Sequence, residues 1–442
     1  MVDTTLSQTA QETDQGAYQL DRRDVAKILY ALDVQDRDQL IASMDPLHPA
    51  DIADLLEQIN PYDRSRLIRL YDREFDGEIL TELQEGLREE IIGLLRPDVL
   101  AEAVRDLETD DVVDLVEDLG DEQQEAILEV LDESDRVAVE NSLNYPEYSA
   151  GRLMQRELVI APENWCVGDA IDYLRSSENL PEQFYHVTLV DGKMHPVAEE
   201  TFQVIPATQD EADVAYAFNQ YHLISTPVVD EDGRIVGVIT IDDAMVVLDE
   251  EHEEDILRLA GVGESNLSDN VLQTTWQRFP WLAVNLVTAI LASLVIAQFE
   301  ATIESFVALA VLMPIIASMG GNAGTQSLTV AVRALATKDL TASNVWRVIR
   351  REALVGLING TLFAVLMGVV GLIWFNSMLL GYVIALAMVI NLVTAGLAGT
   401  GVPVILERFG VDPALASGAF VTTVTDVIGF FAFLGLAAWM LF

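Results

Sequence analysis

A single carboxylate, Asp426, lies inside an apolar run that extends from Ala414 to Phe442. The run is long enough to cross a bilayer, since a membrane-spanning helix needs about 20 apolar residues. A carboxylate at that depth is costly unless it faces a bundle interior or a water-filled path, so it marks an ion or proton route by default. Helical spacing places Thr422 and Thr423 on the same side as Asp426. We therefore expect these three residues to line a pore, the alternative being a hydrogen bond between helices.

This run is the last of five apolar segments, which cover Trp281–Phe299, Ser305–Val332, Ala353–Phe375, Met378–Leu406 and Ala414–Phe442. Loops that carry Lys and Arg alternate with loops that carry none, and cytoplasmic loops are the ones enriched in these residues. With a cytoplasmic N-terminus every loop fits this rule, and the C-terminus then lies outside. Residues 279–442 are thus predicted to form an all-α transmembrane bundle of five helices per chain, surrounded by the lipid of the cell (inner) membrane.

The second apolar segment is rich in glycine and polar groups from Met313 to Ser327. Backbone of this kind at membrane depth is tolerated where it lines a cavity or packs closely on protein. Gly320 and Gly324 also form a G-x-x-x-G pair, a helix-contact motif that needs no ion. Both interpretations stay open. The groups that we expect to line the pore, beside those of the last segment, are Gly320, Gly321, Asn322, Thr325 and, from the fourth segment, Asn391.

The negative charge of the chain is concentrated before the membrane segments. The formal net charge is −46, and only eight acidic and seven basic residues follow Glu264. A domain this acidic should repel nucleic acid and attract cations, above all divalent ones, although a salt-adapted surface has the same composition. Cys166 is the single cysteine, which excludes a disulfide framework. The polar N-terminus is unlike a signal peptide, so we expect the soluble part to be cytoplasmic.

The acidic part divides into segments whose sequence patterns predict different secondary structure. Residues 1–20 are predicted to be a disordered tail, and residues 21–147 an acidic helical N domain resembling a solenoid, because apolar positions recur three and four apart in repeated segments. Residues 249–278 are predicted to be an acidic connecting helix. Six acids between Asp249 and Asp255 would repel one another there unless cations bind them, and a plain solvated helix is the alternative.

Short strands and helices are predicted between these helical segments. Residues 201–248 look like a CBS domain, a β-α-β-β-α module, with two apolar strands joined by an Asp/Gly turn within Thr226–Thr240. Such modules usually occur in pairs. The partner module, residues 148–200, is truncated, because its second strand and closing helix are missing. This truncation weakens the case for ATP binding at the CBS modules.

The candidate pore offers oxygen ligands, which hard cations prefer. Mg²⁺ in particular keeps several waters while it contacts one or two carboxylates. One carboxylate per chain, doubled by a two-fold homodimer, would offset a divalent charge without trapping the ion. The sequence shows no Walker motif and no nucleophile–base pair, so we expect neither an ATP-driven pump nor an enzyme.

From Asp21 onward the chain resembles the MgtE family of magnesium transporters and channels, most specifically in Pro314–Ser327 and in Asp412-Pro413-Ala414 leading to Asp426. The resemblance implies a homodimeric Mg²⁺-selective channel that closes when cytosolic Mg²⁺ bridges its acidic domains, so that Mg²⁺ is both transported and regulatory. By motif position, Asp426 is implied as the pore carboxylate. The implied regulatory acids are Asp243, Glu251, Glu254 and Asp412, which secure the connecting (plug) helix to the membrane domain, and Glu78, Asp110 and Asp114 in the N domain.

The chain also departs from the family pattern. His222, Ala212 and Val246 stand where relatives can carry acids, and Gly418 stands where some carry an amide near the pore. We therefore predict that the pore chemistry is kept while the regulatory sites are fewer, weaker or shifted. Two alternatives remain, which are a channel for another divalent cation such as Mn²⁺ or Co²⁺ and a non-conducting, membrane-anchored sensor of divalent cations.

Overall fold

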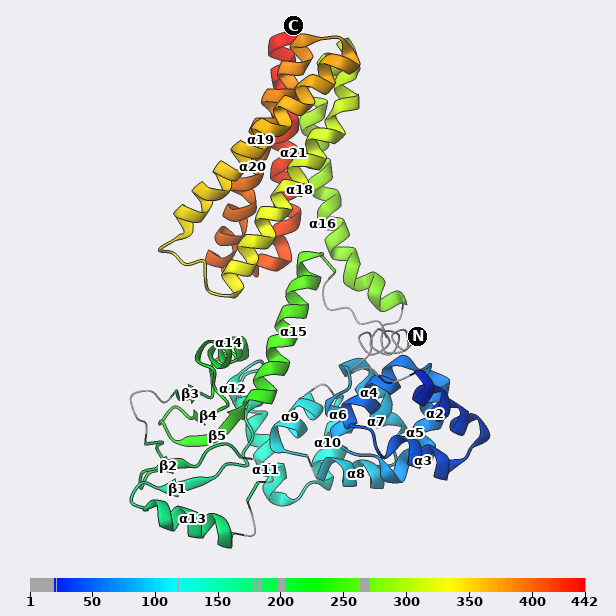
Figure 1. Ribbon diagram of the computed structural model, residues 1–442, viewed down its shortest axis with the longest axis vertical. Coiled ribbons are helices and arrows are strands. Elements are labelled where there is room, and N and C mark those ends of the chain that lie inside the picture. The colour runs from blue at the N-terminus through cyan, green and yellow to red at the C-terminus, as the bar shows by residue number, and fades with distance from the viewer. Residues whose placement is uncertain are drawn as a thin grey trace, which may run out of the picture. The chain divides into compact units, whose positions relative to one another are not determined.

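The computed structural model describes residues 20, 22–105, 107–117, 119–177, 180–181, 184–197, 203–262 and 271–441. The chain forms two compact units, Met1–Asp249 (unit 1) and Glu250–Phe442 (unit 2), which we describe one at a time (Figure 1). The expected tail, residues 1–20, lies outside the described residues apart from Leu20.

The N-terminal part of unit 1 is a stack of short helices, as the sequence predicts. They are α2 (Arg22–Val34), α3 (Arg37–Met44), α4 (Pro49–Gln58), α5 (Pro61–Tyr71), the 3-10 turn η1 (Asp72–Glu74), α6 (Glu78–Thr81), α7 (Glu85–Leu94), α8 (Pro97–Arg105), α9 (Thr109–Glu117), α10 (Asp121–Val130) and α11 (Glu133–Ser142). Their apolar faces share one core that runs from Ile28 to Val139. Proline opens α4 and α5 at the first turn, where its missing N–H costs no hydrogen bond.

Two buried arginines repeat one pattern of contacts in this stack. Arg64 of α5 donates to the carbonyls of Leu56 and Ile59 and pairs with Glu90, 26 positions further along the chain, at 2.7 Å. Arg88 of α7 donates to the carbonyls of Thr81 and Leu83 and pairs with Asp114, again 26 positions on, at 2.8 Å. The stack is therefore built from repeated units, each tied to the next by a guanidinium whose fixed fork suits several acceptors.

The rest of unit 1 contains two small sheets. The second sheet has the order β3 (Ile205–Pro206), β4 (Ser225–Val229), β5 (Ile235–Thr240), with β3 and β4 parallel and β4 and β5 antiparallel. Helix α14 (Glu211–Tyr221) joins β3 to β4, which gives the expected β-α-β-β-α order of a CBS module. Before it, α12 (Ala150–Leu153) is followed by β1 (Ile160–Pro162), α13 (Val167–Ser176) and β2 (Thr188–Val190), and β1 pairs with β2 in parallel.

The acidic connecting helix differs from its expected range. Helix α15 runs from Ile241 to Leu259, so the acidic run continues the closing helix of the second CBS module. At its start, the Asp243 carboxylate accepts a hydrogen bond from the Thr240 backbone N–H at 3.4 Å, as in a capping box, and another from the Thr240 hydroxyl at 2.6 Å. At its end, Gly261 has a φ of +69°, which a helix cannot continue. Residues 263–270 lie outside the described residues, and the next helix begins at Val271.

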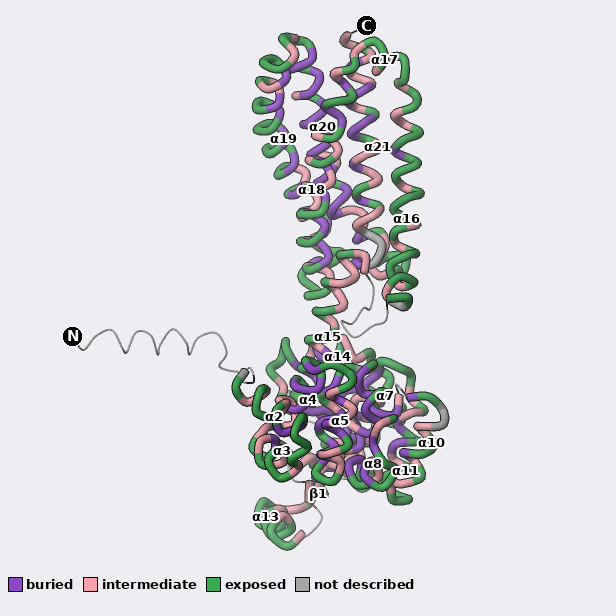
Figure 2. The backbone as a smooth tube through the Cα atoms, turned by 90° about the vertical axis from the view of Figure 1, so that its right-hand side faces the viewer, coloured by how far each residue is buried: buried purple, intermediate pink, exposed green. Residues whose placement is uncertain are grey.

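Among its described residues, unit 2 contains five helices long and apolar enough to cross a membrane, as expected. These are α16 (Val271–Ala297), α18 (Ala308–Ala336), α19 (Val345–Phe375), α20 (Met378–Arg408) and α21 (Pro413–Leu441), with the short helix α17 (Glu300–Ser305) between the first two. Buried positions follow α18, α20 and α21 along the bundle (Figure 2), whereas α16 is mostly exposed. Half of the α20 span is buried, against 6% of the α16 span. Helix α20 is therefore the centre of the bundle.

Glycines let α19 and α20 approach each other closely. A Cβ atom on Gly356 would fall 2.4 Å from the Leu392 carbonyl oxygen, and one on Gly396 would fall 2.5 Å from that of Glu352. Backbones in membranes pack at this distance through small residues, because lipid provides little hydrophobic driving force between helices.

We expect Gly396→Ala to destabilise the membrane unit, because its methyl group would meet a backbone oxygen that cannot move aside. Overpacking of this kind costs about 1–3 kcal/mol. Thermal unfolding of the purified protein in detergent measures the effect. Gly401→Ala on the same helix is the control, since a Cβ there meets nothing within 4 Å. Equal midpoints for the two variants would contradict the close contact.

Candidate functional site

Asp426 lies on α21 and is only partly exposed. Its carboxylate has no hydrogen-bond or ion-pair partner among the described residues. One turn earlier, the hydroxyls of Thr422 and Thr423 donate to the carbonyls of Gly418 and Ala419, at 2.8 and 2.6 Å, so their oxygen lone pairs remain available. The side of α21 expected from sequence therefore carries one unpaired carboxylate and two hydroxyl acceptors, a ligand set that suits a hard cation.

Helix α18 places Gly320 and Gly324 on a different face from Gly321, Asn322 and Thr325. Gly320 and Gly324 are buried, and Cβ atoms on them would fall 2.2 Å from the Asn391 amide nitrogen and 2.6 Å from a Val421 methyl group. The G-x-x-x-G pair is thus a helix contact. Asn322 and Thr325 are exposed, and a Cβ on Gly321 would meet nothing within 4 Å. Of the pore-lining residues expected on α18, these three lie on a face that is open in the single chain.

Asn391 differs from the other expected pore-lining residues. It is fully buried on α20, and its amide nitrogen donates to the carbonyl of Ile316 at 2.8 Å. The amide thus lies in the packing between helices and not on an exposed face.

A second group of expected residues meets within unit 2. Arg258 of α15 pairs with Glu254 at 2.5 Å and with Asp412 at 3.1 Å, and so lies between the two acids. Burial, followed by the charge of Asp412, raises the pKa of Asp255 above its usual value. Glu251 lies one turn before Asp255 and is partly exposed. Asp255 was expected from the sequence only as one of the six clustered acids. Arg258 was not expected, although the i, i+4 spacing of Glu254 and Arg258 was visible.

The N-domain acids form a cluster in unit 1. Asp110 is 7% exposed, and burial together with the charge of Asp243 raises its pKa well above the usual range. Burial, followed by the charge of Asp243, also raises the pKa of Asp111 from 3.8 to about 7. Burial raises the pKa of Asp243 as well, although its hydrogen bond from Thr240 acts in the opposite direction. The negative charges of this cluster therefore destabilise one another in the absence of a cation.

Two further acids border the same cluster. Burial and the charge of Glu157 raise the pKa of Glu108, whose carboxylate accepts a hydrogen bond from Gln155 at 2.6 Å. Glu78 is exposed and contributes to the shift at Glu108. Asp114, by contrast, is ion-paired with Arg88. Within the described ranges, no group of three or more His, Cys, Asp or Glu side chains is arranged to hold a metal ion.

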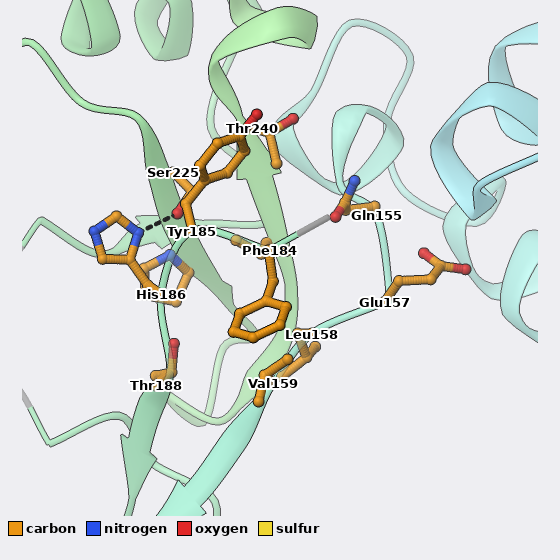
Figure 3. Close-up of a pocket in the computed structure, with 12 residues that line it drawn as sticks. Gln155, Glu157, Leu158, Val159, Phe184, Tyr185, His186, Thr188, Ser225 and Thr240 are labelled. Atoms are coloured by element: carbon orange, nitrogen blue, oxygen red, sulfur yellow. Dashed lines mark hydrogen bonds between the residues drawn. The ribbon is translucent and has the colours of Figure 1, made fainter. Parts of the chain in front are cut away.

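A small pocket lies in the CBS region between the two sheets of unit 1 (Figure 3). Phe184 and Tyr185 present aromatic rings to it, and the ring of His186 is hydrogen-bonded to the Ser225 hydroxyl at 2.5 Å. Among the described residues that line the pocket, Glu157 carries a charged side chain, and this negative charge would repel a phosphate.

Glu352 was not singled out from the sequence. It is 8% exposed on α19 and accepts a hydrogen bond from the Ser327 hydroxyl at 3.0 Å. In the sequence it follows Arg350 and Arg351, so it reads as the end of a charged loop. A buried carboxylate inside a span is a functional candidate by default. The available signal was that Glu352 directly precedes the third apolar segment, which begins at Ala353.

The five spans, the unpaired carboxylate of Asp426 and the acidic unit 1 define a multi-pass membrane protein of the cation-transport class. The chain belongs to the MgtE family. The family model described as a divalent cation transporter matches residues 313–436, that of the MgtE intracellular N domain matches residues 47–148, and a CBS-domain model matches residues 150–250.

Three curated relatives are each named "Magnesium transporter MgtE". The Thermus thermophilus protein is 32% identical over 435 residues, which cover 88% of this chain and 95% of that one. The Bacillus subtilis protein is 29% identical and covers 89% and 92%, and the Enterococcus faecalis protein is 32% identical and covers 68% and 71%. A solved structure titled "cytosolic domain of the Mg2+ channel MgtE in complex with ATP" is 26% identical, covers 50% of this chain and 99% of that one, and has a TM-score of 0.46.

We expect unit 1 to become less stable as the pH rises from 5 to 8 in the absence of divalent cations. The pKa of Asp111 rises from 3.8 in the unfolded chain to about 7 in the folded state. This difference favours folding at a pH below 3.8, and the stabilisation is lost as the pH rises through about 7. A fall of about 5 °C in the unfolding midpoint corresponds to roughly 2 kcal/mol in a domain of this size. Amide hydrogen exchange of unit 1 peptides in the full-length protein, followed against temperature, measures it.

The variant Asp111→Asn should reduce this pH dependence, whereas Asp54→Asn on an exposed face should leave it unchanged. A midpoint that is the same at pH 5 and pH 8 in the unmutated protein would contradict the clustering of the acids.

Proposed function

We propose that this protein is a Mg²⁺-selective channel that closes when cytosolic Mg²⁺ binds its acidic soluble part. The observation that carries the proposal is the unpaired Asp426 carboxylate within a membrane span, beside the free lone pairs of Thr422 and Thr423. Family membership and relatives named as magnesium transporters support Mg²⁺ as the ion. A single carboxylate can hold a hydrated Mg²⁺ through its waters, which offsets charge without trapping the ion.

A homodimer completes this pore in our proposal. Asn322, Thr325 and Thr422 are exposed in the single chain although they lie within membrane spans. Polar groups at this depth are costly against lipid and are tolerated where they line a water-filled cavity. A second copy related by a two-fold axis would enclose them and bring a second Asp426 to the path.

The proposed orientation places the N-terminus in the cytoplasm and the C-terminus outside, in the cell inner membrane. The loop between α18 and α19 and the end of α20 carry Lys or Arg, while the loop between α19 and α20 carries none. This distribution fits the positive-inside rule.

Gating is proposed to follow from repulsion among the acids. The cluster around Asp110, Asp111 and Asp243 holds carboxylates whose pKa values are raised by burial and by one another. Mg²⁺ would relieve this repulsion and favour a compact state, and its removal would favour an open one. At the plug helix, Arg258 already supplies a positive charge between Glu254 and Asp412. This ion-pair arrangement agrees with the prediction that the regulatory cation sites are fewer or weaker than in relatives.

Asp426→Asn should lower Mg²⁺ flux at least about 10-fold, because a neutral amide cannot offset the charge of the hydrated cation. Uptake into proteoliposomes at low internal Mg²⁺ measures it. Asp339→Asn is the control, since Asp339 is an exposed acid paired with the Thr337 hydroxyl outside the spans. Full flux through Asp426→Asn would overturn the pore assignment.

The same liposomes distinguish the alternatives. Faster uptake of Mn²⁺ or Co²⁺ than of Mg²⁺ would favour a channel for those ions. No flux of any divalent cation, with Mg²⁺ still protecting unit 1 from proteolysis, would favour a sensor that does not conduct.

Arg258→Gln should raise flux at low internal Mg²⁺, because Glu254 and Asp412 lose the charge that both share. We expect a several-fold increase with little change at high internal Mg²⁺, where the ion can replace the guanidinium. Uptake measured over a series of internal Mg²⁺ concentrations tests this. Arg136→Gln is the control, since Arg136 pairs with Glu140 on an exposed face of α11. Lower flux in Arg258→Gln at all concentrations would contradict this role.

A further inference from the structure

The side chain of Asn391 is an amide at the centre of the membrane bundle. It is fully buried on α20, its nitrogen donates to the Ile316 carbonyl on α18 at 2.8 Å, and its oxygen has no hydrogen-bond partner among the described residues. Burying an amide whose oxygen accepts no hydrogen bond costs free energy that an apolar residue would not. The position is therefore not explained by stability alone.

Two glycines from different helices make room for this amide. A Cβ on Gly320 of α18 would fall 2.2 Å from its nitrogen, and a Cβ on Gly429 of α21 would fall 2.9 Å from its carbon, nitrogen and oxygen. Real Cβ atoms do not approach this closely. The Asn391 amide thus fills a space that exists because both neighbours lack a side chain, and it contacts α18 and α21 at once.

Both glycines stand next to groups of the candidate ion path. Gly429 lies three residues, about one helical turn, after Asp426 on α21. Gly320 directly precedes Gly321 and Asn322 on α18. The Asn391 amide therefore contacts α21 about one turn after Asp426, and contacts α18 directly before Gly321 and Asn322.

We infer that Asn391 is a positioning residue for ion conduction, holding α18 and α21 in register so that Asp426 faces the path opposite Asn322. Asn391 does not touch the ion, because it is enclosed. The inference rests on the proposed function of Asp426. It accounts for the burial of the Asn391 amide, which a pore-lining role would not explain.

The test uses a size-exchange pair in the full-length protein, assayed by Mg²⁺ uptake into proteoliposomes. Gly429→Ala should raise the external Mg²⁺ concentration for half-maximal flux about 10-fold, because the methyl group displaces the amide. Asn391→Ala should raise it about 3-fold or more through loss of the amide. The double variant should lie closer to wild type than Gly429→Ala does, because the new methyl enters the space that the amide leaves.

A control and a second variant keep the result interpretable. Gly435→Ala on the same helix should change nothing, since a Cβ there meets only a Phe299 ring atom at 3.9 Å. Asn391→Ser, which is smaller than Asn and keeps a donor, should fall between wild type and Asn391→Ala. A role in packing alone would lower the amount of folded protein and the maximal flux, and would leave the half-maximal concentration unchanged.

The outcomes separate the inference from the function on which it rests. Half-maximal concentrations that stay at the wild-type value in Gly429→Ala and Asn391→Ala, while Asp426→Asn still abolishes flux, would overturn the inference alone. Additive effects in the double variant would also overturn it, because the amide and the glycine would then act independently. Full flux through Asp426→Asn would overturn both.

Discussion

Direct contact between helix backbones is the constraint on which the membrane unit depends. Carbonyl oxygens of one helix lie where side chains would stand on the next, at Gly356 and Gly396 between α19 and α20 and at Gly399 between α20 and α18. Such contacts leave no room for adjustment, so the rotation of each helix is fixed once its glycines are placed. Helix α20 contributes to all of these contacts, which explains why its span is the most buried of the five.

Because the rotation of each helix is fixed, the polar side chains of the bundle fall into a buried set and an exposed set. Ser327, Glu352, Asn391, Thr400 and Thr425 are enclosed between helices. Asn322, Thr325 and Thr422 are exposed in the single chain, and Asp426 is partly exposed. The buried set includes the hydrogen bond from Ser327 to Glu352, which joins α18 to α19. The exposed set holds the groups that can meet water and ions.

The sequence predicts the spans well, because length and hydropathy are local properties, and the Asp/Gly turn predicts the β4–β5 hairpin in the same way. It does not distinguish Asn391 from Asn322, since both are amides in apolar segments and burial depends on which helices lie nearby. The end of α15 was missed because the left-handed Gly261 looks like any other glycine in a linker. The position of Arg258 between two acids was missed because Asp412 is remote in the chain.

The buried arginines of the helical stack affect the electrostatic potential at the surface of unit 1. Arg64 and Arg88 lie beneath the surface, while many of the acids stay exposed. The potential at the surface is therefore more negative than a count of charges along the chain suggests, and it gathers a counter-ion atmosphere over about 8–10 Å at physiological salt. Monovalent cations populate that atmosphere as well. The ionic strength of the surrounding solution therefore sets the background against which a divalent ion must compete.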